Sequence, residues 1–142
     1  MLPEDQDSLR SFKAPKTKGY QLTSSLDSMV LLRRNHTSLL APQDLNREML
    51  SDRGLATLAS VADLPCHAIF NQQGRLAGFW EYEKDTQTIV YLAFSGKDAT
   101  LAKSVAETET FIREQLGDAR SFSLDSPKTR VPRIQALREM GK

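Results

Sequence analysis

Apolar and polar residues alternate most regularly in the middle of the chain. Three short apolar runs cover His67–Phe70, Leu76–Tyr82 and Thr88–Phe94, and the polar stretches Asn71–Gly74 and Glu83–Thr86 separate them. Runs of this length that are rich in aromatic and β-branched residues and bounded by turn-forming residues are typical of strands. The pattern therefore predicts a three-stranded antiparallel meander, in which Gln72-Gln73 belong to a turn and Trp80 packs a sheet.

The apolar spacing changes to that of a helix after the meander. Leu101, Val105 and Ile112 fall on one helical stripe. Asp98 is a good N-cap residue, and Gly117 is well placed to end the helix in a left-handed conformation. We therefore predict a long helix between these two residues.

The rest of the chain gives weaker patterns. Residues 42–61 have rough helical spacing, residues 120–124 alternate like a fourth strand, and Ser126-Pro127 is suited to open a last helix with Pro132 as an interruption. These elements predict a single α+β domain over residues 1–142, with a mainly antiparallel sheet packed by one long helix and terminal helices. Residues 1–19 form a lead-in and linker, residues 20–65 form a mixed helical segment, and residues 66–142 form the core.

Composition excludes several classes of protein. The chain has 142 residues, 39% of them hydrophobic and 26% charged, which is ordinary for a globular domain. Its single cysteine, Cys66, rules out an internal disulfide, and its two histidines lack the spacing of a zinc site. No apolar run is long enough to cross a bilayer. We therefore expect a cytoplasmic protein without a metal or cofactor, and a buried or half-buried Cys66 that forms no catalytic pair with His67.

Charge is distributed unevenly. Residues 120–142 carry six basic and two acidic side chains. The basic residues there can contact phosphates or form the exposed face of a terminal helix, and the sequence leaves both readings open. Glu81 and Glu83 share one strand face by their spacing, which is expected of a solvated strand edge.

Three blocks of sequence resemble, in order and spacing, the C-terminal portion of the AlkZ-like winged-helix family. They are PEDQDSLRSF, YQLTSSLDSMVLLRRN and HAIFNQQGRLAGFWEYE, which begin at Pro3, Tyr20 and His67. In that family a leucine-rich segment with an aspartate leads to an arginine pair, and a later strand carries a Gly-Arg-Φ-Φ-Gly-Φ-Trp signature. The matching residues here are Asp27, Arg33, Arg34, Gly74, Arg75, Gly78 and Trp80.

The resemblance implies a role in DNA repair. Members of the family are DNA glycosylases and relatives that remove alkylated bases and unhook interstrand crosslinks with tandem winged helices. Their catalytic glutamine motif lies upstream of the part matched here, so we expect a non-catalytic accessory domain that assists DNA-backbone binding or domain packing. The implied partners are duplex or branched DNA, upstream winged-helix domains or another protein. Candidates for phosphate contact are Arg33, Arg34, Arg75, Lys128, Arg130 and Arg133, and the signature residues Asp27, Gly74, Gly78 and Trp80 are expected to be structural.

Residues 67–141 also resemble the plan of the Gcn5-related acetyltransferases, which is a meander followed by a helix, a strand and a final helix. In that family the strand matched by TIVYLAF leads into a glycine-rich loop that holds the coenzyme A pyrophosphate. The sequence here continues as SGKDATLAKS, with one glycine. The alternative expectation is therefore an acetyltransferase-like domain that uses or has lost acyl-CoA binding. A third expectation is a protein-interaction module, for which an exposed apolar patch would be the sign.

Overall fold

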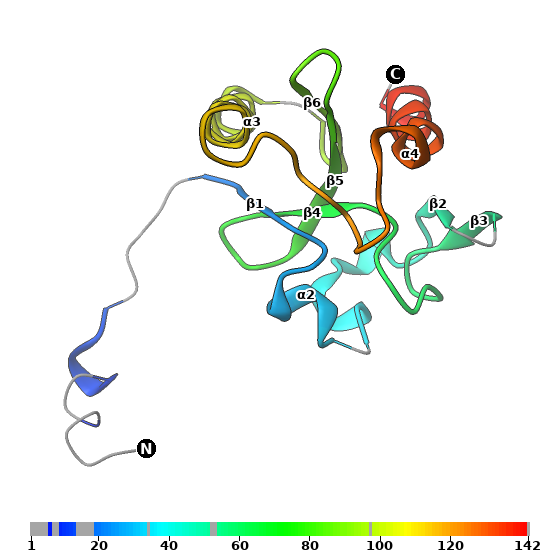
Figure 1. Ribbon diagram of the computed structural model, residues 1–142. Coiled ribbons are helices and arrows are strands. Elements are labelled where there is room, and N and C mark those ends of the chain that lie inside the picture. Colours follow the sequence, from blue (N-terminus) through cyan, green and yellow to red (C-terminus); the bar gives the residue numbers. More distant parts are fainter. Residues whose placement is uncertain are drawn as a thin grey trace.

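Four antiparallel strands form the main sheet of the protein in this computed structural model (Figure 1). The structure describes residues 6, 9–13, 19–33, 35–51, 54–96 and 98–141. The strands lie in the order β1-β4-β5-β6, with bounds Gln21–Thr23, His67–Phe70, Leu76–Glu83 and Thr88–Ala93. Three of them follow one another in the chain as well as in the sheet, which confirms the predicted meander. The fold is α+β with a mainly antiparallel sheet, as the sequence predicts.

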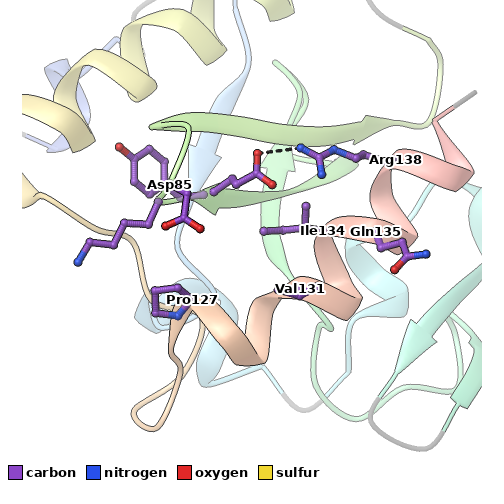
Figure 2. Close-up of a pocket in the computed structure, with 9 residues that line it drawn as sticks. Asp85, Pro127, Val131, Ile134, Gln135 and Arg138 are labelled. Atoms are coloured by element: carbon purple, nitrogen blue, oxygen red, sulfur yellow. Dashed lines mark hydrogen bonds and ion pairs between the residues drawn. The ribbon is translucent and has the colours of Figure 1, made fainter.

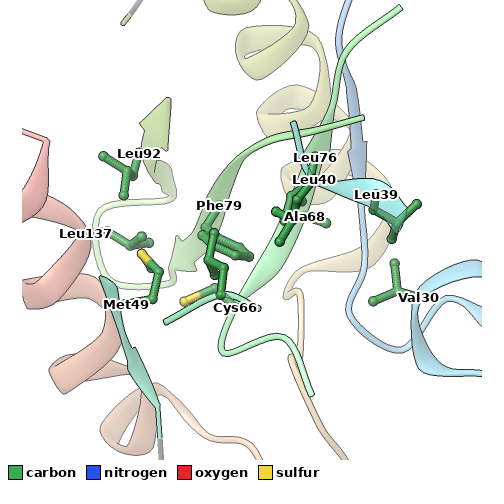
Figure 3. Packing of buried hydrophobic residues seen from close by; sticks show 11 residues of the cluster. Val30, Leu39, Leu40, Met49, Cys66, Ala68, Leu76, Phe79, Leu92 and Leu137 are labelled. Atoms are coloured by element: carbon green, nitrogen blue, oxygen red, sulfur yellow. The ribbon is translucent and has the colours of Figure 1, made fainter. Parts of the chain in front are cut away.

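Two long helices cover opposite faces of this sheet (Figure 1). The helix α3 (Ala99–Phe111) packs on the face that carries Trp80 and Tyr82, where its Leu101 and Val105 are buried. The helix α4 (Pro127–Met140) packs on the other face. Figure 3 shows Leu137 of α4 and Leu92 of β6 gathered around Phe79 of β5. The alternation of side chains along β5 therefore builds two cores, one on each side of the sheet.

Both long helices begin where the sequence indicates. Asp98 caps α3 by accepting the Leu101 N–H, and Ser126 caps α4 by accepting the Thr129 N–H. α3 continues into a π-helical turn, η3 (Ile112–Leu116), and ends at Gly117, whose φ of 70° is left-handed. α4 runs through Pro132 without a break, so the predicted interruption is wrong.

The segment before the meander differs from the prediction. Residues 42–61 are not mainly helical, because η2 (Pro42–Asp44), a short 3₁₀ turn, is the only helical piece among the described residues of this range. A hairpin of β2 (Glu48–Ser51) and β3 (Gly54–Thr57) follows it. Met49 of this hairpin is 1% exposed and joins the core under α4, so tertiary burial outweighs the weak helical spacing. A four-residue helix, α2 (Ser28–Leu31), and the 3₁₀ turn η1 (Thr37–Leu39) lie ahead of them.

The fourth strand of the sheet is also not the predicted one. β1 takes that place by pairing with β4, whereas residues 120–124 contain no strand and residues 121–124 form bends and turns. The reason is that polar groups of these residues bond to side chains elsewhere. The Ser121 N–H donates to Asp125 Oδ2, and the Ser121 hydroxyl donates to the carboxylate of Glu81.

Backbone groups on the free edge of β6 form hydrogen bonds with other residues of the protein. The Ile89 N–H donates to Glu109 Oε2 of α3 at 2.8 Å, and the Gly96 N–H donates to the carbonyl of Ala93 at 3.3 Å. Backbone groups that a further strand would need are thus already used at both ends of this edge.

The start of the chain lies largely outside the described residues. The predicted lead-in and linker at residues 1–19 is described only in part, and residues 9–11 of it are helical. Across the described ranges, no helix is both long enough and apolar enough to span a membrane.

Replacement of Gly78 by alanine is expected to lower the free energy of unfolding by about 1–3 kcal/mol, the usual cost of overpacking. A Cβ at this position would lie 2.1 Å from the carbonyl oxygen of Leu92 on the neighbouring strand. Urea unfolding measures the loss. The matched control is Gly74→Asn, because Gly74 has a φ of 69° with open space around it, and asparagine tolerates such a φ. An equal loss in both variants would contradict the steric explanation.

Candidate functional site

A fully buried arginine lies at the centre of the largest polar cluster that the structure describes. Arg130 of α4 is 0% exposed. Its guanidinium donates to both carboxylate oxygens of Asp118, at 2.7 and 2.9 Å, and to Asp125 Oδ2 at 2.7 Å. It also donates to the carbonyl of Tyr82 at 3.0 Å. A buried cation needs this many acceptors, because an unpaired one would pay the full cost of desolvation.

A second arginine extends the cluster to the sheet. Arg133 lies one turn along α4 and donates from Nε to Glu81 Oε1 at 2.8 Å and from Nη2 to Asp125 Oδ1 at 2.8 Å. Glu81 is 0% exposed and also accepts from the hydroxyl of Ser121. The expectation that Glu81 lies on a solvated strand edge is therefore wrong, and only Glu83 retains partial exposure.

The carboxylates of the cluster fall into two groups, according to whether their surroundings raise or lower the pKa. Burial raises the pKa of Glu81, although Arg133 and Ser121 oppose this effect. Burial also acts to raise the pKa of Asp125, but the Ser121 N–H and both arginines outweigh it and lower the value. The guanidinium of Arg130 likewise lowers the pKa of Asp118. Two arginines thus face three carboxylates, and Glu81 is the carboxylate most readily protonated.

His67 lies beside this cluster at the start of β4. Its ring stacks on Trp80 with centroids 4.3 Å apart, and its Nδ1 accepts the Ser25 N–H at 3.0 Å. Burial lowers the pKa of His67 to about 4, and the backbone of Ala119 offsets this only in part. The folded protein therefore holds a neutral imidazole at neutral pH.

The Ser25–His67 contact does not have the geometry of a nucleophile and its base. The Ser25 hydroxyl is 3.3 Å from His67 Nδ1, but it donates to the carbonyl of Ser121 at 2.6 Å. A base with so low a pKa would also abstract a proton poorly at neutral pH. Cys66 gives no alternative nucleophile, because burial and the nearby Glu81 raise its pKa. The prediction of a buried, unpaired thiol is confirmed.

A groove of about 580 Å³ opens above the cluster. Its walls come from α2, from the loop at residues 60–65 and from the turn that holds Ser121 and Phe122. Arg133 lies at the base of the groove with its guanidinium 5.3 Å from the Phe122 ring. A smaller pocket of about 220 Å³ lies between the β5–β6 turn and α4 (Figure 2). An ion pair between Arg138 and Glu83, at 2.7 Å, crosses this second pocket.

The structure gives different surroundings to the basic residues that were predicted to contact DNA. Arg130 is fully enclosed, so the expectation that it lies on an exposed helix face is wrong, and Arg133 has its donors engaged by acids. Arg75 is exposed but donates to the carbonyl of Leu40 at 2.7 Å. Lys128 and Arg33 lie exposed on different elements, and Arg34 falls outside the described residues. Two of the predicted phosphate contacts, Arg130 and Arg133, are therefore already engaged by carboxylates.

The four signature residues have evident structural roles. Asp27 caps α2 by accepting the Met29 N–H at 2.8 Å, and Gly74 provides the left-handed residue of the β4–β5 turn. Gly78 allows β6 to approach closely, and Trp80 donates from Nε1 to the carbonyl of Ala68 at 3.1 Å.

Sequence reasoning missed the acidic half of the cluster. Glu81 lies 37 residues before Asp118, and Asp118 and Asp125 lie seven residues apart in a turn with no pattern that connects them to Glu81. One signal was present, which is a charged residue inside an otherwise apolar strand, between Phe79 and Tyr82. Buried charges of this kind need a partner, so Glu81 alone indicated a buried cation.

Replacement of Arg130 by methionine is expected to lower the free energy of unfolding by about 3–5 kcal/mol, because Asp118 and Asp125 would remain without their buried partner. Chemical denaturation measures the loss. The matched control is Lys128→Met on the exposed side of the same helix, for which we expect a change within about 0.5 kcal/mol. Similar stability of the two variants would show that the cluster is not needed for folding.

Stability is also expected to depend on pH through His67. The unfolded chain binds a proton with a pKa near 6.5, whereas the folded imidazole binds it only near 4, so the unfolded state holds more protons between these values. The free energy of unfolding should therefore fall by about 3 kcal/mol as the pH falls from 6.5 to 4. His67→Gln keeps a hydrogen-bond acceptor and should remove this part of the dependence. If the free energy of unfolding depended on pH in the same way in the unchanged protein and in the variant, the assignment of this effect to His67 would be refuted.

Comparison of the chain with protein-family models, with curated proteins and with solved structures found no match. Relatives therefore assign no role to the groove or to the cluster. The described residues also contain no group of three or more histidine, cysteine or acidic side chains that could hold a metal ion.

Proposed function

We propose that the chain is a non-catalytic accessory domain of a winged-helix DNA-glycosylase-like protein and that it acts mainly by packing on a partner domain. The observation that carries this proposal is the apolar surface of α2. Leu26, Met29, Leu31 and Leu32 are 43%, 68%, 56% and 76% exposed, and they lie within one short segment. Several large apolar side chains exposed within one short segment are a sign of an interaction site.

The polar cluster supports a structural rather than a catalytic role. Its arginines and carboxylates satisfy one another, and neither Ser25 nor Cys66 is activated as a nucleophile. DNA contact is the lesser part of the proposal. It would use Arg33, Arg75 and Lys128, three exposed basic residues that can supply only weak attraction to phosphates that is independent of sequence.

The acetyltransferase-like alternative gains no support from the geometry. The carboxylate of Asp98 already accepts the Leu101 N–H at the start of α3, where that family would hold the coenzyme A pyrophosphate. A negative side chain in this position repels a pyrophosphate and uses an amide that would bind it. Residues 120–124 also provide no strand to follow the helix.

The packing role predicts that Met29→Ser/Leu32→Ser reduces binding to the winged-helix region of such a protein from the same genome at least tenfold, since both side chains would lose apolar contacts. Co-expression and calorimetry measure this loss. Phe111→Ser is the matched control, because Phe111 is 54% exposed on α3, away from α2. Unchanged binding of the double variant would contradict packing through this surface.

DNA titration by fluorescence anisotropy at 50 and 200 mM salt separates the two parts of the proposal. Packing as the main role requires DNA affinity to be weak and to disappear at the higher salt concentration. Tight binding at 200 mM salt that is lost on replacing Arg33 and Arg75 would instead make DNA binding the principal function.

A further inference from the structure

The groove above the ion cluster has the dimensions of a small-molecule site. Its volume is about 580 Å³, and ligand pockets in proteins usually measure roughly 300–1,000 Å³. Residues of the α2 region, the β2–β3 hairpin, the loop at residues 60–65, the turn at residues 121–122 and α4 all line it. Several distant parts of the chain can therefore contact one bound molecule at once.

Apolar side chains form the larger part of this lining. α2 contributes Val30 and Leu31, the loop at residues 60–65 contributes Val61 and Leu64, and the turn contributes Phe122. Leu31 and Phe122 are still 56% and 40% exposed in the protein alone. A ligand with an apolar body would remove this surface from water, which favours binding.

One buried polar atom in the lining has no partner. His36 lines the groove and is 3% exposed, and its Nδ1 forms no hydrogen bond with any of the residues that the structure describes. A buried polar atom left unpaired is costly, so a ligand that pairs with it gains affinity. A neutral imidazole can hold its proton on either nitrogen. A hydroxyl group suits both forms, because it can donate to Nδ1 or accept from it.

Three serines of the groove have already used their hydroxyl protons. Ser25 donates to the carbonyl of Ser121 at 2.6 Å, and Ser60 donates to the carbonyl of Thr57 at 2.8 Å. Ser121 itself donates to the carboxylate of Glu81 at 2.8 Å. A hydroxyl oxygen has two lone pairs, so a serine that donates its proton can still accept. These side chains therefore favour a ligand that donates a hydrogen bond over one that only accepts.

Charge gives the groove no preference for an ion. Among the described lining residues, Arg133 provides a guanidinium and Asp63 a carboxylate. The guanidinium already donates to Glu81 and to Asp125, each at 2.8 Å, so an anion would find these donors occupied. Asp63 is exposed, and water weakens its attraction for a cation. A neutral ligand loses the least hydration when it enters such a site.

We propose that the groove binds a small neutral molecule with an apolar body and a hydroxyl group, the body against Leu31 and Phe122 and the hydroxyl paired with His36. This inference is independent of the function proposed above. Met29 and Leu32, the two side chains that test domain packing, do not line the groove. Failure of one proposal would therefore leave the other unchanged.

Three naphthalene probes test the proposal in NMR titrations of the full chain at neutral pH. 2-Naphthol has the rings and the hydroxyl, 2-methoxynaphthalene keeps the rings and the oxygen without the proton, and 2-naphthoate is an anion of similar shape. 2-Naphthol is expected to shift amide signals of residues 25–31, 60–64 and 121–122, and to bind at least tenfold more tightly than either of the other probes. No shift at these residues, or an equal affinity for 2-naphthol and either of the other probes, would overturn the proposal.

Matched variants locate the ligand within the protein. Leu31→Trp fills part of the groove and is expected to weaken 2-naphthol binding at least tenfold, whereas Leu32→Trp, at the next residue but outside the lining, should leave it unchanged. Both leucines are largely exposed, so neither change should disturb folding. His36→Phe removes the unpaired nitrogen and should lower the affinity for 2-naphthol to that for 2-methoxynaphthalene. Equal binding by the two tryptophan variants would show that the groove is not the site.

Discussion

The burial of one guanidinium constrains most of this structure. Arg130 lies on α4, yet its acceptors come from the end of β5, from the turn after α3 and from the residue before the α4 N-cap. A cation without solvent must find all its partners at once, so the two helices and the sheet cannot be placed independently. The hydrophobic clusters on the two faces of the sheet supply most of the stability of the fold. The guanidinium determines how the two helices are joined across it.

The turn between the helices shows what this constraint displaces. Residues 120–124 alternate between apolar and polar side chains as the residues of a strand do. Their polar groups instead bond to Asp125 and Glu81, because the cluster offers charged acceptors in a buried place where hydrogen bonds to ions are strong. Long-range polar contacts, rather than the local alternation of apolar and polar residues, therefore determine the structure of this segment.

Sequence reasoning succeeded where local signals agreed with burial. The meander and α3 are marked by turns, caps and periodic apolar residues, and all of these act within a few residues. The hairpin of β2 and β3 was missed because its buried Met49 is held by distant residues rather than by its own periodicity. The excess of basic residues at the end of the chain was evident from the sequence, but net charge does not show which of these residues form ion pairs. Arg133 and Glu81 are 52 residues apart, and only the fold brings them together.

The closed edge of β6 has a consequence for how the protein can associate. The Ile89 N–H is bonded to Glu109 and the Ala93 carbonyl to the Gly96 N–H, so two of the backbone groups that a strand of a second copy would need at this edge are already occupied. Growth of a continuous sheet from molecule to molecule, the first step toward a fibril, is obstructed at this edge even though β6 is among the most apolar strands of the chain.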